Sequence, residues 1–143
     1  MALGKKGDLS DFDNVPFHRY LGITVADQSA DHVRLRLTVG ETTPTGIDGS
    51  VNGGALATLV DMAAVAAVVS GLREGTALGG TADLQVSYLR QAKGAWLDAS
   101  AEVLRRGRNL CVVEVSVRND AGVLCSKGRV LYALRTVDSA RAQ

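Results

Sequence analysis

The feature that most constrains this chain is the segment from Val51 to Leu72, which is almost continuously apolar. Its length approaches that of a membrane span, but Asp61 lies at its centre, where insertion of a charge costs roughly 2.5–3.5 kcal/mol. Most of its other residues are alanine, glycine and valine, which contribute little insertion energy. The segment is also too long for a strand. We therefore expect a helix that is buried inside a folded domain.

The ends of this helix carry suitable terminating residues. Asn52 is the expected N-cap, because its side chain can accept a hydrogen bond from an amide two or three residues further on. Gly53 and Gly54 follow directly and leave the first helical amides unhindered. Gly71 and Gly75 bracket the expected end. Because the segment is apolar on nearly all sides, we expect it to be covered on most of its surface.

Strands are expected on both sides of the helix, because apolar and polar residues alternate there. His32–Val39 follows a shorter strand, Gly22–Ala26, and Asp27–Asp31 is the expected hairpin loop. Four more strands are expected after the helix, at Ala77–Leu89, Trp96–Leu104, Leu110–Val117 and Leu124–Leu134. The last four should form an antiparallel meander, and one helix can cover one face of such a sheet. The predicted class is α+β, with an antiparallel sheet wrapped around one long central helix.

Size and composition indicate one globular domain. With 143 residues, of which 46% are hydrophobic and 22% charged, the chain can bury a core without disulfides or metal. A formal net charge of +1 provides no general field for nucleic acid or an anionic membrane, so we expect neither partner. The expected domain spans residues 11–136, with flexible ends at 1–10 and 137–143. The N-terminus lacks the apolar stretch of a signal peptide, so a cytoplasmic location is expected.

The cysteines and histidines do not form a metal-binding pattern. Cys111 and Cys125 lie far from His18 and His32, so we expect no metal site and two reduced core thiols. Both histidines are expected at the surface or in packing. The glycines at 79 and 80 lack the lysine and the following helix of a nucleotide-binding loop, so no cofactor is expected.

Asp61 and the start of the helix are the candidate chemical groups. Asp61 is the only charged residue in the helix before Arg73, and a carboxylate in apolar surroundings suits a general base or a nucleophile. The alternative is a structural carboxylate that is hydrogen-bonded to backbone or to a hydroxyl. The amide of Gly53, at the positive end of the helix dipole, can hold a carbonyl oxygen as it becomes an oxyanion, worth about 3 kcal/mol.

The separation of these two groups predicts an oligomer. Gly53 and Asp61 lie roughly 12 Å apart along one helix axis, so one carbonyl cannot touch both within one chain. If both act on one substrate, the site combines Gly53 of one subunit with Asp61 of another. This predicts a two-fold dimer with antiparallel helices near the interface and two equivalent sites.

From Pro16 to Tyr132 the chain resembles the hotdog-fold thioesterases of the phenylacetate-pathway type. The resemblance is carried by the glycine pair after Asn52, by Asp61 eight residues after the first of these glycines, and by the segment Thr81–Arg90. It implies hydrolysis of acyl-CoA thioesters in a homodimer or homotetramer. It also implies an oxyanion amide at Gly53, a carboxylate at Asp61 and an orienting hydroxyl at Thr81.

The chain departs from the family pattern at two positions. The family usually has His where Asn52 stands, and some relatives have Asn where Gly46 stands. An amide can cap the helix and hydrogen-bond to a thioester but cannot carry a proton, so a non-catalytic acyl-CoA-binding or regulatory module is the alternative function. A hydratase would need a histidine near the central helix, and no histidine follows His32.

The remaining expected contacts are with the substrate. Val51, Gly54 and Thr58 are expected to line the binding site around the start of the helix. The basic residues expected near the phosphates of coenzyme A are Arg105, Arg106 and Arg108, with Arg90 and Lys93. A simply solvated basic turn is the alternative for these side chains.

Overall fold

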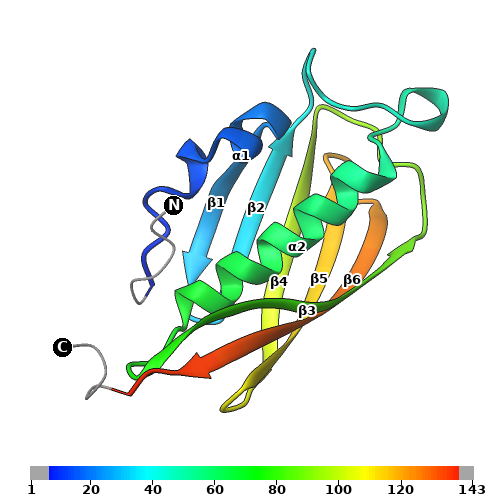
Figure 1. The fold of residues 1–143 in the computed structure, drawn as a ribbon. Helices are drawn as coiled ribbons and strands as arrows, with labels where there is room; N and C mark the ends of the chain where they lie inside the picture. Colours follow the sequence, from blue (N-terminus) through cyan, green and yellow to red (C-terminus); the bar gives the residue numbers. More distant parts are fainter. Residues whose placement is uncertain (1–6, 139–143) are drawn as a thin grey trace.

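The computed structural model describes residues 7–138 and consists of an antiparallel sheet that wraps around one long helix (Figure 1). The elements in chain order are η1 (Phe12–Asn14), α1 (Pro16–Leu21), β1 (Ile23–Ser29), β2 (His32–Thr38), η2 (Ile47–Gly49), α2 (Gly53–Ser70), β3 (Thr76–Tyr88), β4 (Trp96–Arg106), β5 (Leu110–Asn119) and β6 (Leu124–Thr136). The outermost parts of the two expected flexible ends, residues 1–6 and 139–143, lie outside the described residues.

The sheet differs from the expected meander in the position of β3. The spatial order is β1-β2-β4-β5-β6-β3, with every neighbouring pair antiparallel. Strands β4, β5 and β6 do form a meander, but β3 pairs with β6 and β4 pairs with β2. The reason is that α2 carries the chain across the face of the sheet to its far edge before β3 begins (Figure 1). β3 is therefore an edge strand of 13 residues.

The expected helix is confirmed and forms the centre of the core. α2 has the length and hydropathy of a membrane span, but in this fold it lies along the face of the sheet with ten buried residues (Figure 1). Gly128 on β6 permits this close approach, because a Cβ there would overlap a methyl group of Val60. Asn52 caps the helix as expected: its Oδ1 accepts from the amides of Gly54 at 2.8 Å and Ala55 at 3.4 Å.

The N-terminal segment packs more closely than expected. Leu9 is buried in the core and the amide of Gly7 donates to the carbonyl of Val69, so residues 7–10 are part of the folded domain. Pro16 begins α1, a position that suits its fixed φ and its missing amide hydrogen. Gly22 ends α1 with a φ of 73°, and a Cβ at this glycine would lie 2.7 Å from the carbonyl oxygen of Thr38. Glycine is therefore required at this junction.

The expected packing roles of the cysteines and of one histidine are confirmed. Cys111 and Cys125 are buried and free, and burial raises the pKa of both thiols. His18 is buried against Phe12, and its Nδ1 lies 2.8 Å from the carbonyl oxygen of that residue. His32 is exposed at the start of β2. The hairpin before it is tighter than expected, because β1 extends to Ser29.

Candidate active site

Asp61 lies halfway along α2 and accepts a hydrogen bond from Thr81 on the edge strand β3. Thr81 Oγ1 donates to Asp61 Oδ1 over 2.6 Å. Irregularities in the β3–β6 ladder occur on both sides of Thr81, between Leu78 and Gly80 and between Thr81 and Asp83. Such bulges redirect side chains from the regular alternation. The sequence thus brings together a carboxylate and a hydroxyl that lie twenty positions apart.

This pair opens onto a pocket of about 420 Å³, which we call the carboxylate pocket. Its lining residues are Asp61, Met62, Val65, Leu78, Gly80, Thr81 and Tyr132. Asp61 is half-buried, and within residues 7–138 its second oxygen, Oδ2, has no hydrogen-bond partner. This oxygen is therefore free to accept a hydrogen bond from a molecule that enters the pocket.

The start of α2 forms a second hollow, the helix-terminus pocket, with a volume of about 480 Å³. Six of its lining residues are Val51, Asn52, Gly53, Leu56, Tyr88 and Arg90. The Asn52 side chain occupies the amides of Gly54 and Ala55. Among the described residues, none accepts a hydrogen bond from the Gly53 amide. The Gly53 amide is therefore free to donate to a ligand oxygen, and the Gly54 amide is not.

The two pockets lie on separate parts of one chain. They share no lining residue, and Gly53 and Asp61 are separated by roughly 12 Å of helix. One carbonyl cannot contact the Gly53 amide and the Asp61 carboxylate of the same chain.

One stripe of α2 is left uncovered by the chain's own sheet. Residues that recur at intervals of about one turn along α2 remain half-exposed: Ala57, Thr58, Asp61, Met62 and Val65. Most of these side chains are apolar, and Asp61 lies in the middle of them. Thr58 donates its hydroxyl to the carbonyl of Gly54 over 3.0 Å and lines neither of the two pockets. Its expected substrate contact is therefore not apparent in one chain.

The basic residues expected to act together are divided between the two ends of α2. Arg90 lines the helix-terminus pocket. Arg106 and Arg108 instead line a smaller pocket with Arg73, beyond the C-terminal end of α2. Gly53 and Val68, whose carbonyl bonds to Arg106, are about 22 Å apart along the helix. Within a single chain, the structure therefore does not bring Arg90 together with Arg106 and Arg108.

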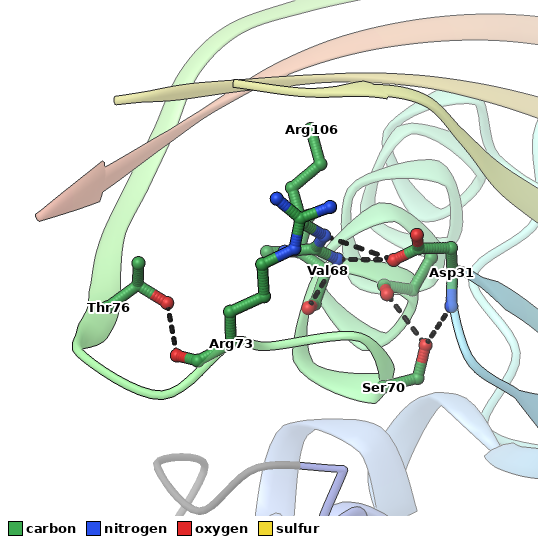
Figure 2. Close-up of polar contacts among 7 residues, drawn as sticks. Asp31, Val68, Ser70, Arg73, Thr76 and Arg106 are labelled. Atoms are coloured by element: carbon green, nitrogen blue, oxygen red, sulfur yellow. Dashed lines mark hydrogen bonds and ion pairs between the residues drawn. The ribbon is translucent and has the colours of Figure 1, made fainter. Parts of the chain in front are cut away.

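Arg106 has a structural role in this chain. Its side chain is 4% exposed, and its Nη2 donates to Asp31 Oδ1 over 2.6 Å and to the carbonyl of Val68 over 2.9 Å (Figure 2). Ser70 contacts the same turn by accepting from the Asp31 amide at 3.0 Å. Arg106 thus ties the end of β4 to the end of α2 and to the β1–β2 hairpin. Direct contact between this guanidinium and a substrate phosphate is not supported.

Two tyrosines of the site are strand aromatics, a residue type that by itself indicates only packing. Tyr88 Oη donates to the Gly53 carbonyl over 2.6 Å, which holds the end of β3 against the start of α2. Tyr132 lines the carboxylate pocket beside Asp61. Alternation along β6 does place Tyr132 on the face that covers α2, together with Val130. Its position opposite Thr81 depends on the β3–β6 pairing, which the sequence does not indicate.

Comparisons with known proteins identify the class to which this fold and site belong. The thioesterase superfamily model matches residues 48–126, which is more than half of the chain. The chain therefore belongs to the thioesterase superfamily. The matched region includes both glycines at the start of α2, the Asp61–Thr81 pair and strands β3 to β5.

Particular relatives agree with this assignment. A protein of Halobacterium salinarum that is named as an esterase is 44% identical to this chain over 101 residues. The match covers 68% of this chain and 66% of that protein, so the chain spans just under two thirds of the relative's length. A thioesterase structure from Streptococcus pneumoniae with coenzyme A is 24% identical, with a TM-score of 0.76 and coverage of 92% and 100% of the two chains. The PaaI protein of the E. coli phenylacetic acid degradation operon is 22% identical, with a TM-score of 0.72 and coverage of 85% and 90%. These structures confirm the expected hotdog fold.

Proposed function

We propose that the protein hydrolyses acyl-CoA thioesters to a free acid and coenzyme A, in a site that two subunits share. The observation that carries this proposal is the hydrogen-bonded pair of Asp61 and Thr81, which opens onto a pocket on the uncovered stripe of α2. Membership of the thioesterase superfamily supports hydrolase chemistry. Coenzyme A in two of the related structures supports a CoA thioester as the substrate.

In the proposed reaction the thioester carbonyl points at the Gly53 amide of one subunit. Negative charge develops on this oxygen, and the amide and the α2 dipole stabilise it. Asp61 of the other subunit either removes a proton from water as the water attacks the carbonyl carbon, or attacks this carbon itself to form a mixed anhydride that water hydrolyses in a second step. The C–S bond then breaks, and the departing thiolate takes up a proton. Thr81 keeps the carboxylate oriented through its hydrogen bond to Oδ1.

The dimer in this proposal is supported by surfaces that one chain leaves open. β3 is a long edge strand, and unpaired edges of this length are usually covered. Leu84 and Tyr88 on β3 and Leu89 just after it are between 38% and 54% exposed. Together with the half-exposed stripe of α2, these residues provide an apolar face for a second copy. A two-fold axis between antiparallel α2 helices would bring each Gly53 to the Asp61 of the other chain.

The phosphates of coenzyme A are proposed to contact Arg90 and Arg108. Arg90 belongs to the pocket that contains Gly53, and Arg108 lies beyond the end of the helix that contains Asp61. In a shared site these two arginines come from different subunits. Arg106 supports the second position through its bonds to Asp31 and Val68.

A non-catalytic acyl-CoA-binding module is the competing function, because Asn52 cannot transfer a proton. Release of free thiol from a panel of acyl-CoAs distinguishes the two. We expect turnover by the wild-type protein and a loss of at least about a hundredfold in kcat for Asp61→Asn. Asp11→Asn is the control, because it makes the same substitution at an exposed residue outside both pockets, and this variant should retain activity. Binding of acyl-CoA without any thiol release would establish the module instead.

A further inference from the structure

In the described part of the chain, Tyr132 has a hydroxyl group without a hydrogen-bond partner. The residue is 5% exposed and lines the carboxylate pocket. It is paired with Thr81 in the β3–β6 ladder, so the two residues lie opposite each other next to Asp61. Within residues 7–138 the Tyr132 hydroxyl forms no hydrogen bond, although buried tyrosines normally find a partner for this group.

Tyr132 and Asp61 belong to one pocket and interact electrostatically. The two side chains line the same pocket and form no direct hydrogen bond, although the charge of Asp61 acts on the phenol. Polar groups that interact across more than a hydrogen-bond length are commonly bridged by water. Burial, followed by the charges of Asp61 and Cys111, raises the pKa of Tyr132. The phenol therefore remains a neutral donor throughout the neutral and mildly alkaline range.

We propose that Tyr132 Oη positions the hydrolytic water against Asp61 Oδ2, which makes Asp61 a general base. This inference rests on the proposed function. Thr81 occupies Oδ1, so Oδ2 remains to accept a proton from the water. The water accepts a hydrogen bond from Tyr132 through one lone pair and attacks the carbonyl carbon with the other. Its proton passes to Asp61 and then to the departing thiolate, while Tyr132 keeps its own proton.

The test variant is Tyr132→Phe, which removes one oxygen and keeps the ring in the core. We expect kcat to fall about tenfold to hundredfold for every acyl-CoA that the protein hydrolyses. The KM, and the Kd of an unreactive acyl-CoA thioether, should change less than about threefold, because the water is not part of ground-state binding. The matched control is Tyr20→Phe, since Tyr20 is 56% exposed on α1 and lines neither pocket. Its kcat should stay unchanged.

A single turnover in ¹⁸O-labelled water tests the same inference without a mutation. Direct attack by the water that Tyr132 holds puts one ¹⁸O atom into the acid product. Attack by Asp61 would form a mixed anhydride, and hydrolysis of this anhydride at the Asp61 carboxyl carbon would give an unlabelled acid and an ¹⁸O atom in Asp61, which would overturn the inference. A crystal structure with the thioether should show one water within hydrogen-bonding distance of Tyr132 Oη and Asp61 Oδ2, and its absence would also contradict the inference.

The outcomes separate this inference from the proposed function. If the wild-type protein releases no thiol from any acyl-CoA, the proposed function itself fails. If Asp61→Asn abolishes turnover while Tyr132→Phe retains kcat, the function stands and the role of Tyr132 is refuted. An effect of Tyr132→Phe on KM and thioether binding alone would assign the phenol to the acyl group and would equally refute its role with water.

Discussion

Thr81 donates its hydroxyl to Asp61 over 2.6 Å and thereby connects the edge strand β3 to the middle of the core helix. The bond occupies one carboxylate oxygen and fixes the direction of the other. A carboxylate that is held in this way requires little reorganisation before it accepts a proton. The contact between strand and helix therefore serves the chemistry of the proposed site.

Removal of this hydroxyl should reduce the rate more than the affinity. For Thr81→Val, which has nearly the same shape, we expect kcat to fall about tenfold with a small change in KM, because the Asp61 carboxylate loses its orientation. Thr81→Ser retains the hydroxyl and should keep most of the activity. Steady-state kinetics of both variants on one acyl-CoA provide the measurement. Equal activity of the valine and serine variants would show that the bond is dispensable.

Loss of either proposed phosphate contact should affect only substrates that carry the phosphates of coenzyme A. For Arg90→Ala and Arg108→Ala we expect the KM of an acyl-CoA to rise about tenfold at low salt, and less at high salt. The same acyl group on N-acetylcysteamine lacks the phosphates and should be hydrolysed with unchanged kinetic constants. Arg105→Ala is the control, because Arg105 is exposed and lines none of the pockets described above. An effect on the truncated substrate would contradict the assignment.

Arg106 should matter for stability. Its buried guanidinium pairs with Asp31 and bonds to the Val68 carbonyl. Arg106→Met should lower the free energy of unfolding by about 2 kcal/mol, because Asp31 and the end of α2 lose their donor. Asp31 is 42% exposed and can be partly rehydrated, which limits the loss. Urea unfolding measures the difference, and Arg105→Met provides a surface control. Unchanged stability would rule out the structural role.

An ion pair on the outer face of the sheet should make a small, pH-dependent contribution to stability. A hydrogen bond from Arg36, assisted by Arg34, holds the pKa of Asp98 below its ordinary value of 3.8. The stabilisation is therefore present above pH 4 and is lost as the pH falls through the lower pKa of the folded state. Asp98→Asn should cost less than about 1 kcal/mol at neutral pH, since the pair is partly exposed. Urea unfolding at pH 7 and pH 2 should show this difference only at pH 7.

The sequence predicts the local elements of this fold better than their arrangement. Alternation over His32–Val39 and the cap at Asn52 are local signals, and both elements form as expected. The location of β3 at the sheet edge depends on which edge the chain has reached at the end of α2, and no local sequence pattern encodes that position.

The same limit applies to the site. Asp61 is conspicuous in the sequence as a lone charge in an apolar helix. The roles of Tyr132 and Arg106 depend on the pairing of distant strands and on the burial of one basic residue of an otherwise exposed turn. Neither property follows from residue type, so the sequence does not predict a polar role for Tyr132 and predicts a phosphate contact for Arg106.

Sharing of the site between subunits can be measured by mixing two inactive variants. Asp61→Asn removes the carboxylate. Gly53→Pro removes the amide hydrogen at the first helical position, where proline is tolerated and where a Cβ would meet Tyr88 only at ordinary contact distance. Gly53→Ala is the matched control, because it adds a Cβ but keeps the amide and should remain active.

When the two inactive variants are unfolded, mixed in equal amounts and refolded together, each mixed dimer contains one site with an intact Gly53 and an intact Asp61. We expect thiol release to recover to about one quarter of the wild-type rate, since half of the dimers are mixed and each has one competent site. If the mixture stays as inactive as its two components, while refolded wild-type protein regains its activity, the two groups do not act across the subunit interface.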